Sequence, residues 1–430
     1  MNLSSWGNYP KIETKVFSFE NENRLKEILL QDLEFISFGN GRSYGDSAIN
    51  RNIIHTKKYN SFLAFDEISG ILHCESGVLL SEILDSFVKR GYFLEITPGT
   101  KLITVGGAIA SDVHGKNHHK MGCFSECVKE FNLMLPNGEI KNVQKGDELF
   151  KLTCGGMGLS GVILDVKLRL KKINSKYIAQ KTFKTESLQQ TFEIFEKYKD
   201  ENYSVAWIDC LAKDNQIGKS LVMFGDFLDD GDLDYKEKSK LTIPFDFPTF
   251  TLNSLSVKAF NYLYYNKAPN GESHKKVDID TFFYPLDSIN YWNRIYGKNG
   301  FTQYQFILPK ESSFDGLSEI LREISNSNKG SFLAVLKLYG KANENYLSFP
   351  IEGYSLALDF KIENGLFALL DKLDKIVVKY GGRIYLTKDC RVKREIFEVG
   401  YPQIDKFRAL RKEYEMDKKF NSLQSIRVGI

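Results

Sequence analysis

The sequence predicts an α+β protein, with a glycine-loop domain followed by a domain built on an antiparallel sheet. Three observations predict this class. Glycine clusters recur between short apolar runs in residues 39–45, 98–119 and 155–161. Strand and helix patterns follow one another as β-α-β-β-α-β over residues 301–387. The length of 430 residues is typical of two or three domains, and 42% apolar residues supply a large core.

The first two glycine loops read GNGRSYGD at residues 39–46 and PGT…TVGGAIASDVHGKNHH at residues 98–119. Glycine at this density lets backbone N–H groups converge and lets a ligand approach the main chain. We therefore expect a pyrophosphate cradle. A dinucleotide fingerprint requires a strand, a glycine loop and a helix in that order, whereas a hairpin signal around Ser69 and Gly70 follows this loop.

The remaining elements of the first domain follow from periodicity. Helical spacing predicts a helix within residues 20–31 and a second helix from Leu80 that stops at Gly91. A Pro-Asn-Gly turn predicts a hairpin over residues 131–143, and an apolar run predicts a strand over residues 162–170. These elements complete one domain by about residue 172.

The middle of the chain is less regular. Residues 188–198 have the pattern of a helix, and the five aspartates of residues 226–234 indicate a solvated loop rather than a metal site. Residues 253–265 form an aromatic-rich helix, which we interpret as an ordinary buried helix. The alternatives are a helix that covers a pocket and one that faces a membrane surface.

From residue 301 the pattern becomes sharper. We expect strands over residues 301–308, 331–339, 354–360 and 383–387, with helices over residues 314–325 and 366–380. A period of two puts Gln303 and Gln305 on one face, and likewise Ser355, Ala357 and Asp359. Because Lys337 lies inside the apolar run SFLAVLKLYG, we interpret this face as a substrate wall. A half-exposed sheet with scattered polar residues is the alternative.

Composition excludes several functions. A net charge of +3 gives no bulk electrostatic case for nucleic acid. We find neither a signal-peptide pattern nor an apolar run of about 18 residues, so we expect a cytoplasmic protein, with peripheral contact to the inner membrane as an extension. The six scattered cysteines predict free thiols, and the loose grouping of Cys123 and Cys127 with His118 and His119 does not predict a metal site.

The two loops resemble the flavin-binding half of the vanillyl-alcohol-oxidase-like, PCMH-type FAD-linked oxidoreductases. More narrowly, the chain resembles the oxidase components of decaprenylphosphoryl-β-D-ribose 2-epimerase. GRSYGD together with HGKNHH is a specific pair of motifs, and the resemblance covers most of the chain. It includes FYPLD at residues 283–287, WNRIYG at 292–297, QYQF at 303–306, LSFP at 347–350, and Lys388 with Asp389.

The resemblance implies FAD as cofactor, bound non-covalently, although some relatives in the broader superfamily attach it through a histidine of the second loop. It also implies a division into a FAD-binding domain of residues 1–172, a substrate or cap domain of 173–388, and a segment of 389–430 that returns to the FAD domain. The implied cofactor-binding residues are Ser37, Phe38, Gly39, Asn40, Gly41, Arg42, Ser43, Tyr44, Gly45, Asp46, Ser47, Gly99, Thr104, Val105, Gly106, Gly107, Ser111, Asp112, Val113, His114, Ile163 and Tyr385.

The reaction implied is oxidation of a secondary sugar hydroxyl, on a sugar linked to polyprenyl phosphate, as the first half of an epimerisation in cell-envelope polysaccharide synthesis. A separate NAD(P)H-dependent keto-sugar reductase is the implied partner. Lys388, His114 and Tyr44 are the implied catalytic residues, with Lys388 acting as base or as charge stabiliser. The candidate substrate-binding residues are Gln303, Gln305, Lys337 and Ser355.

Three positions depart from the family pattern and put its lipid and sugar specificity in doubt. Ala357 stands where mycobacterial members carry a cysteine that covalent inhibitors target, Ser355 replaces an asparagine, and Phe283 replaces a tyrosine. The alternative function is that of an alditol or aldonolactone oxidase acting on free sugars. A flavin-binding protein without catalytic function is a more distant alternative, and it would not need Lys388.

Overall fold

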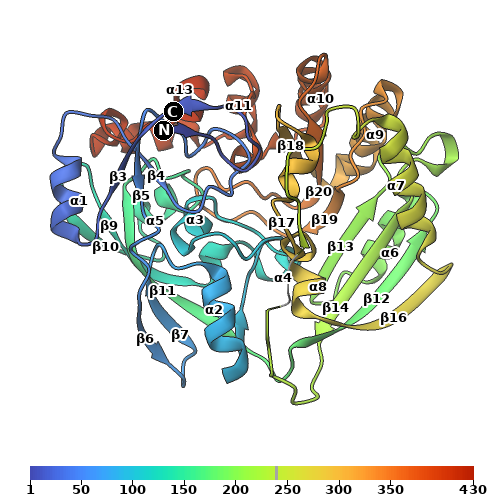
Figure 1. Ribbon diagram of the computed structural model, residues 1–430, viewed down its shortest axis with the longest axis horizontal. Coiled ribbons are helices and arrows are strands. Elements are labelled where there is room, and N and C mark those ends of the chain that lie inside the picture. Colours follow the sequence, from blue (N-terminus) through green and yellow to red (C-terminus); the bar gives the residue numbers. More distant parts are fainter. Residues whose placement is uncertain (238–240) are drawn as a thin grey trace.

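The computed structural model describes residues 1–237 and 241–430, and it confirms the α+β class. Two halves lie side by side in Figure 1, the glycine-loop half at the left and a large sheet with its helices at the right. No helix in the described parts of the chain combines the length and hydropathy needed to cross a bilayer.

The glycine-loop half is built on two main sheets and the helices around them. A parallel sheet has the order β3-β5-β4, and an antiparallel sheet has the order β10-β9-β11-β7-β6, with β8 paired to the end of β11. The strands are β3 (Lys15–Ser18), β4 (Ile36–Phe38), β5 (Asn52–His55), β6 (Phe62–Asp66), β7 (Ile71–Glu75), β8 (Tyr92–Leu94), β9 (Val128–Met134), β10 (Ile140–Gln144) and β11 (Val162–Lys172). The helices are α1 (Glu22–Leu29), α2 (Leu80–Phe87), α3 (Val105–Ala110), α4 (His118–Met121) and α5 (Glu148–Thr153).

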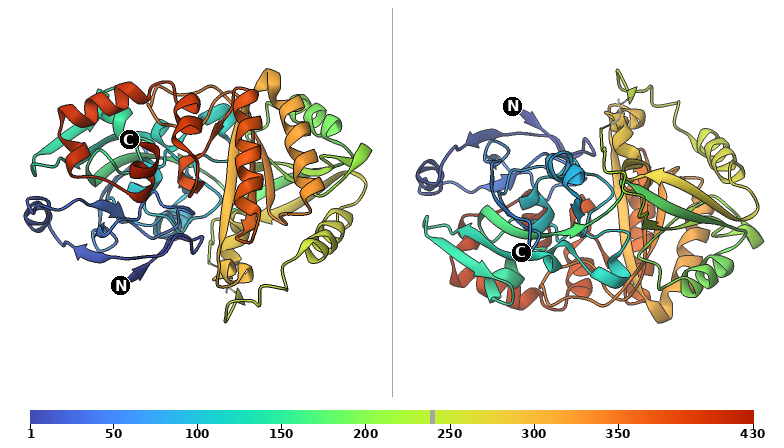
Figure 2. Two further views of the ribbon diagram at one scale, coloured as in Figure 1. Left: turned by 90° about the horizontal axis from the view of Figure 1, so that it is seen from above. Right: turned by 90° about the horizontal axis from the view of Figure 1, so that it is seen from below.

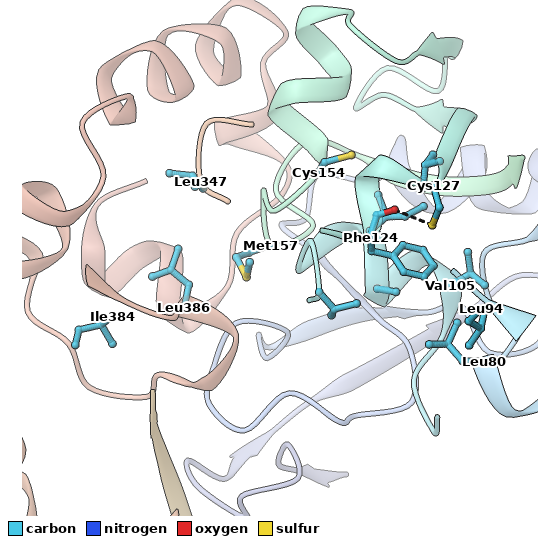
Figure 3. Close-up of a cluster of buried hydrophobic side chains, with 14 of the residues drawn as sticks. Leu80, Leu94, Val105, Phe124, Cys127, Cys154, Met157, Leu347, Ile384 and Leu386 are labelled. Atoms are coloured by element: carbon cyan, nitrogen blue, oxygen red, sulfur yellow. Dashed lines mark hydrogen bonds between the residues drawn. The ribbon is translucent and has the colours of Figure 1, made fainter. Parts of the chain in front are cut away.

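The core of this half forms where α2 and α3 pack on the antiparallel sheet. Leu80 of α2, Val105 of α3 and Phe124 are all buried in this core, as Figure 3 shows. The Cys127 thiol donates to the Phe124 carbonyl oxygen at 3.0 Å in the same core. All six cysteines of the chain are buried and free. This packing buries one side of α3, which lies within the second glycine loop.

The second half is built on one eight-stranded antiparallel sheet of order β16-β12-β14-β13-β19-β20-β18-β21. Its strands are β12 (Tyr177–Thr185), β13 (Tyr203–Ile208), β14 (Ser220–Phe227), β16 (Gly271–Asp278), β18 (Phe301–Pro309), β19 (Ala334–Tyr339), β20 (Gly353–Lys361) and β21 (Arg383–Ile384). Helices α6 (Leu188–Lys197), α9 (Ser313–Ser327) and α10 (Leu366–Lys379) cover one face, and the other face turns toward the glycine loops (Figure 2). The predicted β-α-β-β-α-β order is confirmed as β18-α9-β19-β20-α10-β21.

The remaining elements are short or peripheral. They are β1 (Asn2–Leu3), β2 (Ile12–Glu13), β15 (Leu241–Thr242), β17 (Ile289–Asn290), α7 (Ser254–Asn266), α8 (Ile279–Phe283), α11 (Arg394–Gly400), α12 (Ile404–Glu413) and α13 (Leu423–Val428). The last three helices lie against the glycine-loop half (Figure 1). Phe35 exchanges backbone hydrogen bonds with Lys419 and Asn421, and the Leu423 amide donates to Ile49.

Two sequence-based expectations were wrong. The helix predicted at residues 253–265 exists as α7, but it is not an ordinary buried helix, because only Val257, Asn261 and Tyr265 are buried along it. The strand predicted over residues 383–387 ends at Ile384, and a 3₁₀ turn over Leu386–Lys388 follows. The turn forms because the tail holds this segment: Gln424 Nε2 donates to the Leu386 carbonyl at 2.7 Å.

Candidate active site

A cavity of 680 Å³ lies between the two glycine loops and the helix-free face of the eight-stranded sheet. Both halves of the molecule contribute its walls. This is the position at which two packed layers commonly hold a ligand, with main-chain donors on one side and selective side chains on the other. The cavity is large enough for an extended cofactor and part of a substrate.

The first glycine loop follows β4 and supplies free main-chain donors. Within the described residues, none of the backbone N–H groups of residues 39–43 has a hydrogen-bond acceptor. Gly41 has φ of +62°, and a Cβ on Gly39 would lie 2.5 Å from Thr104 Oγ1, so both positions require glycine. A run of convergent N–H groups of this kind binds anions such as a pyrophosphate.

The second loop includes α3, and its glycines contribute space next to the cavity. The Gly106 amide already donates to Ser76 O at 2.8 Å, and the Gly107 amide donates to Thr104 Oγ1 at 3.1 Å. No atom lies within 4 Å of the position that a Cβ on Gly99 would occupy, which leaves the main chain open to the cavity. The first loop therefore offers a run of amides that are free for an anion, whereas the Gly106 and Gly107 amides of the second loop are already satisfied.

Buried polar atoms without partners also point into this region. Within the described residues, Ser37 Oγ, Ser76 Oγ and His114 Nδ1 are buried and lack hydrogen-bond partners, and all three residues line the cavity. A buried polar group without a partner is costly, so a polar ligand is expected to complete these bonds. The loop amides, the glycine contacts and these atoms together fit FAD.

His114 is held as a neutral imidazole. Its ring packs 5.0 Å from the rings of Tyr339 and Tyr385, and Gln305 Nε2 lies 3.2 Å from His114 Nε2. Burial lowers the pKa of His114 well below its ordinary value, and the nearby Lys337 charge lowers it further. A neutral ring that accepts from Gln305 at Nε2 carries its proton on Nδ1, which is available to a ligand.

Lys388 lies at the end of the 3₁₀ turn, with Nζ 3.8 Å from the centroid of the Tyr44 ring. The Tyr44 amide donates to Thr387 O at 3.2 Å, which joins the first glycine loop to this turn. Burial lowers the pKa of Lys388, the carboxylate of Asp359 opposes that change, and Lys337 adds to it. A lysine with a lowered pKa is able to accept a proton near neutral pH.

The polar wall predicted on the sheet is a buried wall of the cavity rather than a half-exposed face. Gln303 lies opposite Asp359 in the β18–β20 register, and Gln303 Nε2 donates to Asp359 Oδ1 at 2.5 Å. Gln305 Nε2 donates to Ser355 Oγ at 3.2 Å. Burial raises the pKa of Asp359, because the charged carboxylate is removed from water.

Two further lysines line the cavity. Burial lowers the pKa of Lys337, in the middle of β19, to about 8. Burial, followed by the charge of Lys337, lowers the pKa of Lys116 to about 7. Lys116 Nζ donates to the carbonyl oxygens of Phe282 and Phe283 at 2.5 and 3.3 Å. Neither ammonium group has a carboxylate partner in the described part of the chain, so this end of the cavity favours an anion.

Arg42 adds a cation near the loop. Its guanidinium carbon lies 3.9 Å from the centroid of a Trp6 ring, which fixes its plane. Burial lowers the pKa of Arg42, and the charge of Asp287 opposes this. Asp287 accepts from Thr100 Oγ1 and from the Lys101 amide, both at 2.8 Å, so it ties the second loop to the FYPLD segment.

Most of the candidate residues line the cavity, including all four substrate-binding and all three catalytic candidates. Five cofactor candidates do not. Phe38 and Val105 belong to the core, and the others contact protein groups elsewhere: Gly45 lies against Asp389 O, Asp46 pairs with Arg427 at 2.7 Å, and Asp112 accepts from Asn345, Ser348 and the Ser125 amide.

Sequence reasoning missed several lining residues. Lys116 stands inside HGKNHH, two residues after His114, and its position in that motif was the available signal. Trp207, Phe260 and Tyr264 also line the cavity, and they come from β13 and α7, far from either loop in sequence. Nothing in the local pattern of Trp207 indicates that it lines a cavity. For Phe260 and Tyr264, the available signal was the alternative of a helix that covers a pocket.

The comparisons with known proteins agree with this geometry. Residues 20–144 match the protein family described as FAD binding domain. They contain the free loop amides, α3 and His114. The fold and the site therefore define an FAD-linked oxidoreductase, and the cofactor is FAD.

A decaprenylphosphoryl-β-D-ribose oxidase of Mycolicibacterium smegmatis is 32% identical to this chain over 442 aligned residues, which cover 98% of this chain and 95% of the relative. The chain belongs to the family of that oxidase. An uncharacterized protein of Streptomyces coelicolor is 27% identical, over 82% of this chain and 100% of the relative. A Neurospora crassa protein described as a D-arabinono-1,4-lactone oxidase is 24% identical over only 36% of this chain, which does not favour the free-sugar alternative.

Proposed function

We propose that this enzyme oxidises a secondary hydroxyl of a sugar linked to polyprenyl phosphate, as a decaprenylphosphoryl-ribose 2-oxidase does. One observation carries the proposal. Two buried lysines that have no carboxylate partner among the described residues, Lys116 and Lys337, line the same cavity as Gln303 and Gln305. That combination suits a phosphate next to a polyhydroxylated ring, because lysine binds phosphate as a point charge and amides bind hydroxyls.

Each residue has a role in this proposal. Lys388 Nζ takes the proton from the reacting hydroxyl. The Tyr44 ring, which lies against Nζ, holds the lysine in place. When bound, the flavin accepts the hydride from the same carbon. Gln303 and Gln305 orient the sugar, and Asp359 and Ser355 fix those two amides in turn. His114, with its Nδ1 proton, donates to the cofactor or to the substrate.

The division of labour follows the chain. We propose that residues 1–172 and 389–430 hold FAD without a covalent bond, and that residues 173–388 select the substrate. The ion pair of Arg427 with Asp46 in the first loop supports a tail that stabilises the cofactor cradle. The ketone product needs reduction from its other face to complete an epimerisation. A separate NAD(P)H-dependent reductase, acting in cell-envelope polysaccharide synthesis, is the partner we propose.

The test is anaerobic reduction of the bound flavin, followed as loss of the oxidised band at roughly 450 nm. We expect bleaching with a polyprenyl-phosphoribose and none with free pentoses or alditols. Bleaching with free alditols would instead assign the enzyme to the oxidases of soluble sugars. A preparation that bleaches with neither, although loaded with FAD, would refute the proposed substrate class.

A further inference from the structure

An exposed apolar surface surrounds α7, and no element of the described chain covers it. We call the outer side of α7 with residues 241–250 the α7 surface. Leu255, Leu263 and Tyr262 are 77, 69 and 65% exposed, and Phe250 is 75% exposed. Figure 2 shows α7 and the chain before it along the outer margin of the molecule. Large apolar side chains gathered in this way mark an interaction site.

The same helix forms part of the cavity on its other side. Tyr264 packs 4.9 Å from Trp207 and Phe260 packs 5.4 Å from Phe332, measured between ring centroids, and all four residues line the cavity. Asn261 Nδ2 donates to Asp209 Oδ1 at 2.7 Å, which anchors the helix through its narrow buried stripe. The outer surface and the cavity wall are therefore two faces of one helix.

The cavity wall changes from polar to apolar toward α7. Lys337 and Val335 of β19 line the cavity two residues apart, and Leu333, just before the strand, lines it as well. Val335 pairs with Trp207 in the register of β19 and β13, and Trp207 contacts Tyr264 of α7. An amphipathic ligand with its anionic head at Lys337 would therefore direct its apolar chain along this wall to α7.

The α7 surface also carries more positive than negative charge. Residues 241–270 contain one acidic residue, Asp246, and two lysines, Lys258 and Lys267, both exposed on α7 or at its end. Exposed tyrosines accompany the leucines, as is usual at the boundary between lipid and water. A helix with an apolar outer face and flanking lysines lies in the headgroup region of an anionic bilayer, and it does not need to span that bilayer.

We propose that the α7 surface docks the enzyme on an anionic phospholipid bilayer and that a lipid-linked sugar passes from the bilayer into the cavity beneath α7. The second clause rests on the proposed function, and the docking itself does not. Exposing the apolar polyprenyl chain of such a substrate to water is unfavourable. Docking through the α7 surface avoids this exposure, because the polyprenyl chain passes directly from the bilayer to the cavity.

The test is flotation of the FAD-loaded enzyme with vesicles of phosphatidylcholine, with and without phosphatidylglycerol. We expect binding to the anionic vesicles, and a drop of about tenfold or more in the double variant Leu255→Ser/Leu263→Ser, because two apolar side chains no longer enter the lipid. Lys258→Glu/Lys267→Glu should lose binding only where phosphatidylglycerol is present. The matched control is Ile68→Ser, which removes a 92% exposed apolar side chain between β6 and β7.

Flavin reduction separates docking from function. The Leu255→Ser/Leu263→Ser variant should reduce its flavin at the wild-type rate with a short-chain, water-soluble phosphoribose, and at least tenfold more slowly with a long-chain substrate in vesicles. This unchanged reaction also shows that the variant is folded. Failure of the wild type with the short-chain substrate would count against the proposed function alone, since vesicle binding is measured without substrate.

Three results would overturn the docking proposal. The first is wild-type enzyme that stays unbound to anionic vesicles, and the second is a leucine variant that floats as well as the wild type. The third is a dimer, measured by light scattering, that the leucine variant converts to a monomer in the absence of vesicle binding. In that case the α7 surface is a contact between two copies of the chain.

Discussion

Lys388 is the residue on which the proposed chemistry depends. It is buried in the cavity, above the Tyr44 ring, with its pKa lowered by burial. We predict that Lys388→Met slows flavin reduction by at least ~100-fold, the scale of lost general-base catalysis, while FAD stays bound. Stopped-flow bleaching measures the rate, and the flavin absorbance of the purified variant measures cofactor content.

The matched control is Lys375→Met, an exposed lysine of α10, which should react like the wild type. Lys388→Arg separates the two roles of the lysine. Arginine keeps the charge but does not deprotonate, so near-normal activity in that variant would contradict proton abstraction and favour stabilisation of the alkoxide by charge.

Asp359 affects the pKa of Lys388, and in the proposed reaction that pKa determines the pH at which Lys388 accepts a proton. Its negative charge raises the pKa of Lys388 against the effect of burial. Replacing the carboxylate in Asp359→Asn removes that opposition, so the pKa of Lys388 falls further and the neutral amine dominates at lower pH. We predict that the rising limb of the pH–rate profile moves to lower pH. A limb that stays in place or moves to higher pH would mean that another group titrates there.

Lys116 and Lys337 are predicted to act on the phosphate rather than on the reacting carbon. A hydrogen bond to a charged group is worth about 1.5–3 kcal/mol. Lys337→Met and Lys116→Met should therefore each raise KM for a phosphate-linked sugar by roughly 10- to 100-fold. A phosphate-free glycoside of the same sugar provides the comparison. An equal loss with both substrates would place these lysines at the sugar instead.

At the scale of elements, sequence patterns predicted what depends on local spacing. The glycine loops and the β18-α9-β19-β20-α10-β21 order follow from turn chemistry and period. Lys337 in an apolar strand indicated the polar wall, since an unpaired lysine there needs a reason. For α7 the sequence left exposure as an alternative only, because an aromatic-rich helix is usually buried and local spacing does not show which elements pack against it.

The early end of β21 illustrates the same limit. Residues 385–387 suit a strand locally, but Thr387 O accepts from Tyr44 and Leu386 O accepts from Gln424. These partners lie more than 300 and almost 40 residues away in the sequence, respectively. Contacts of this range convert the expected strand into the turn that presents Lys388.

The tail helix α13 offers a test at this scale. Arg427 donates to Asp46 at 2.7 Å and to Asp389 at 2.9 Å, and both carboxylates are buried. Arg427→Ala leaves two buried charges without their cation, which costs about 3 kcal/mol. We predict a fall of several degrees in Tm by calorimetry and weaker retention of FAD. Arg394→Ala, which breaks only an exposed pair with Glu398, should change Tm little.

At the scale of the whole molecule, the cavity is the seam between two halves whose sheets share no strand. The glycine loops supply main-chain donors from one side, and the eight-stranded sheet supplies lysines and amides from the other. Helices α6, α9 and α10 cover one face of that sheet, and the other face therefore turns toward the cavity. The packing of these helices depends on the assembled fold, so the local sequence does not predict it. A ligand in the seam contacts both halves, so it should act as a clamp between them.

That role of FAD leads to the last prediction. A ligand that binds only the native state adds RT ln(1 + [L]/Kd), or about 2.7 kcal/mol at a free concentration of 100 Kd. We therefore predict that Tm rises with added FAD, in proportion to the logarithm of its concentration. We also expect acid precipitation to leave the flavin in the supernatant, since the proposed binding is non-covalent. Flavin that pellets with the protein, or a Tm independent of FAD, would contradict non-covalent binding in the seam.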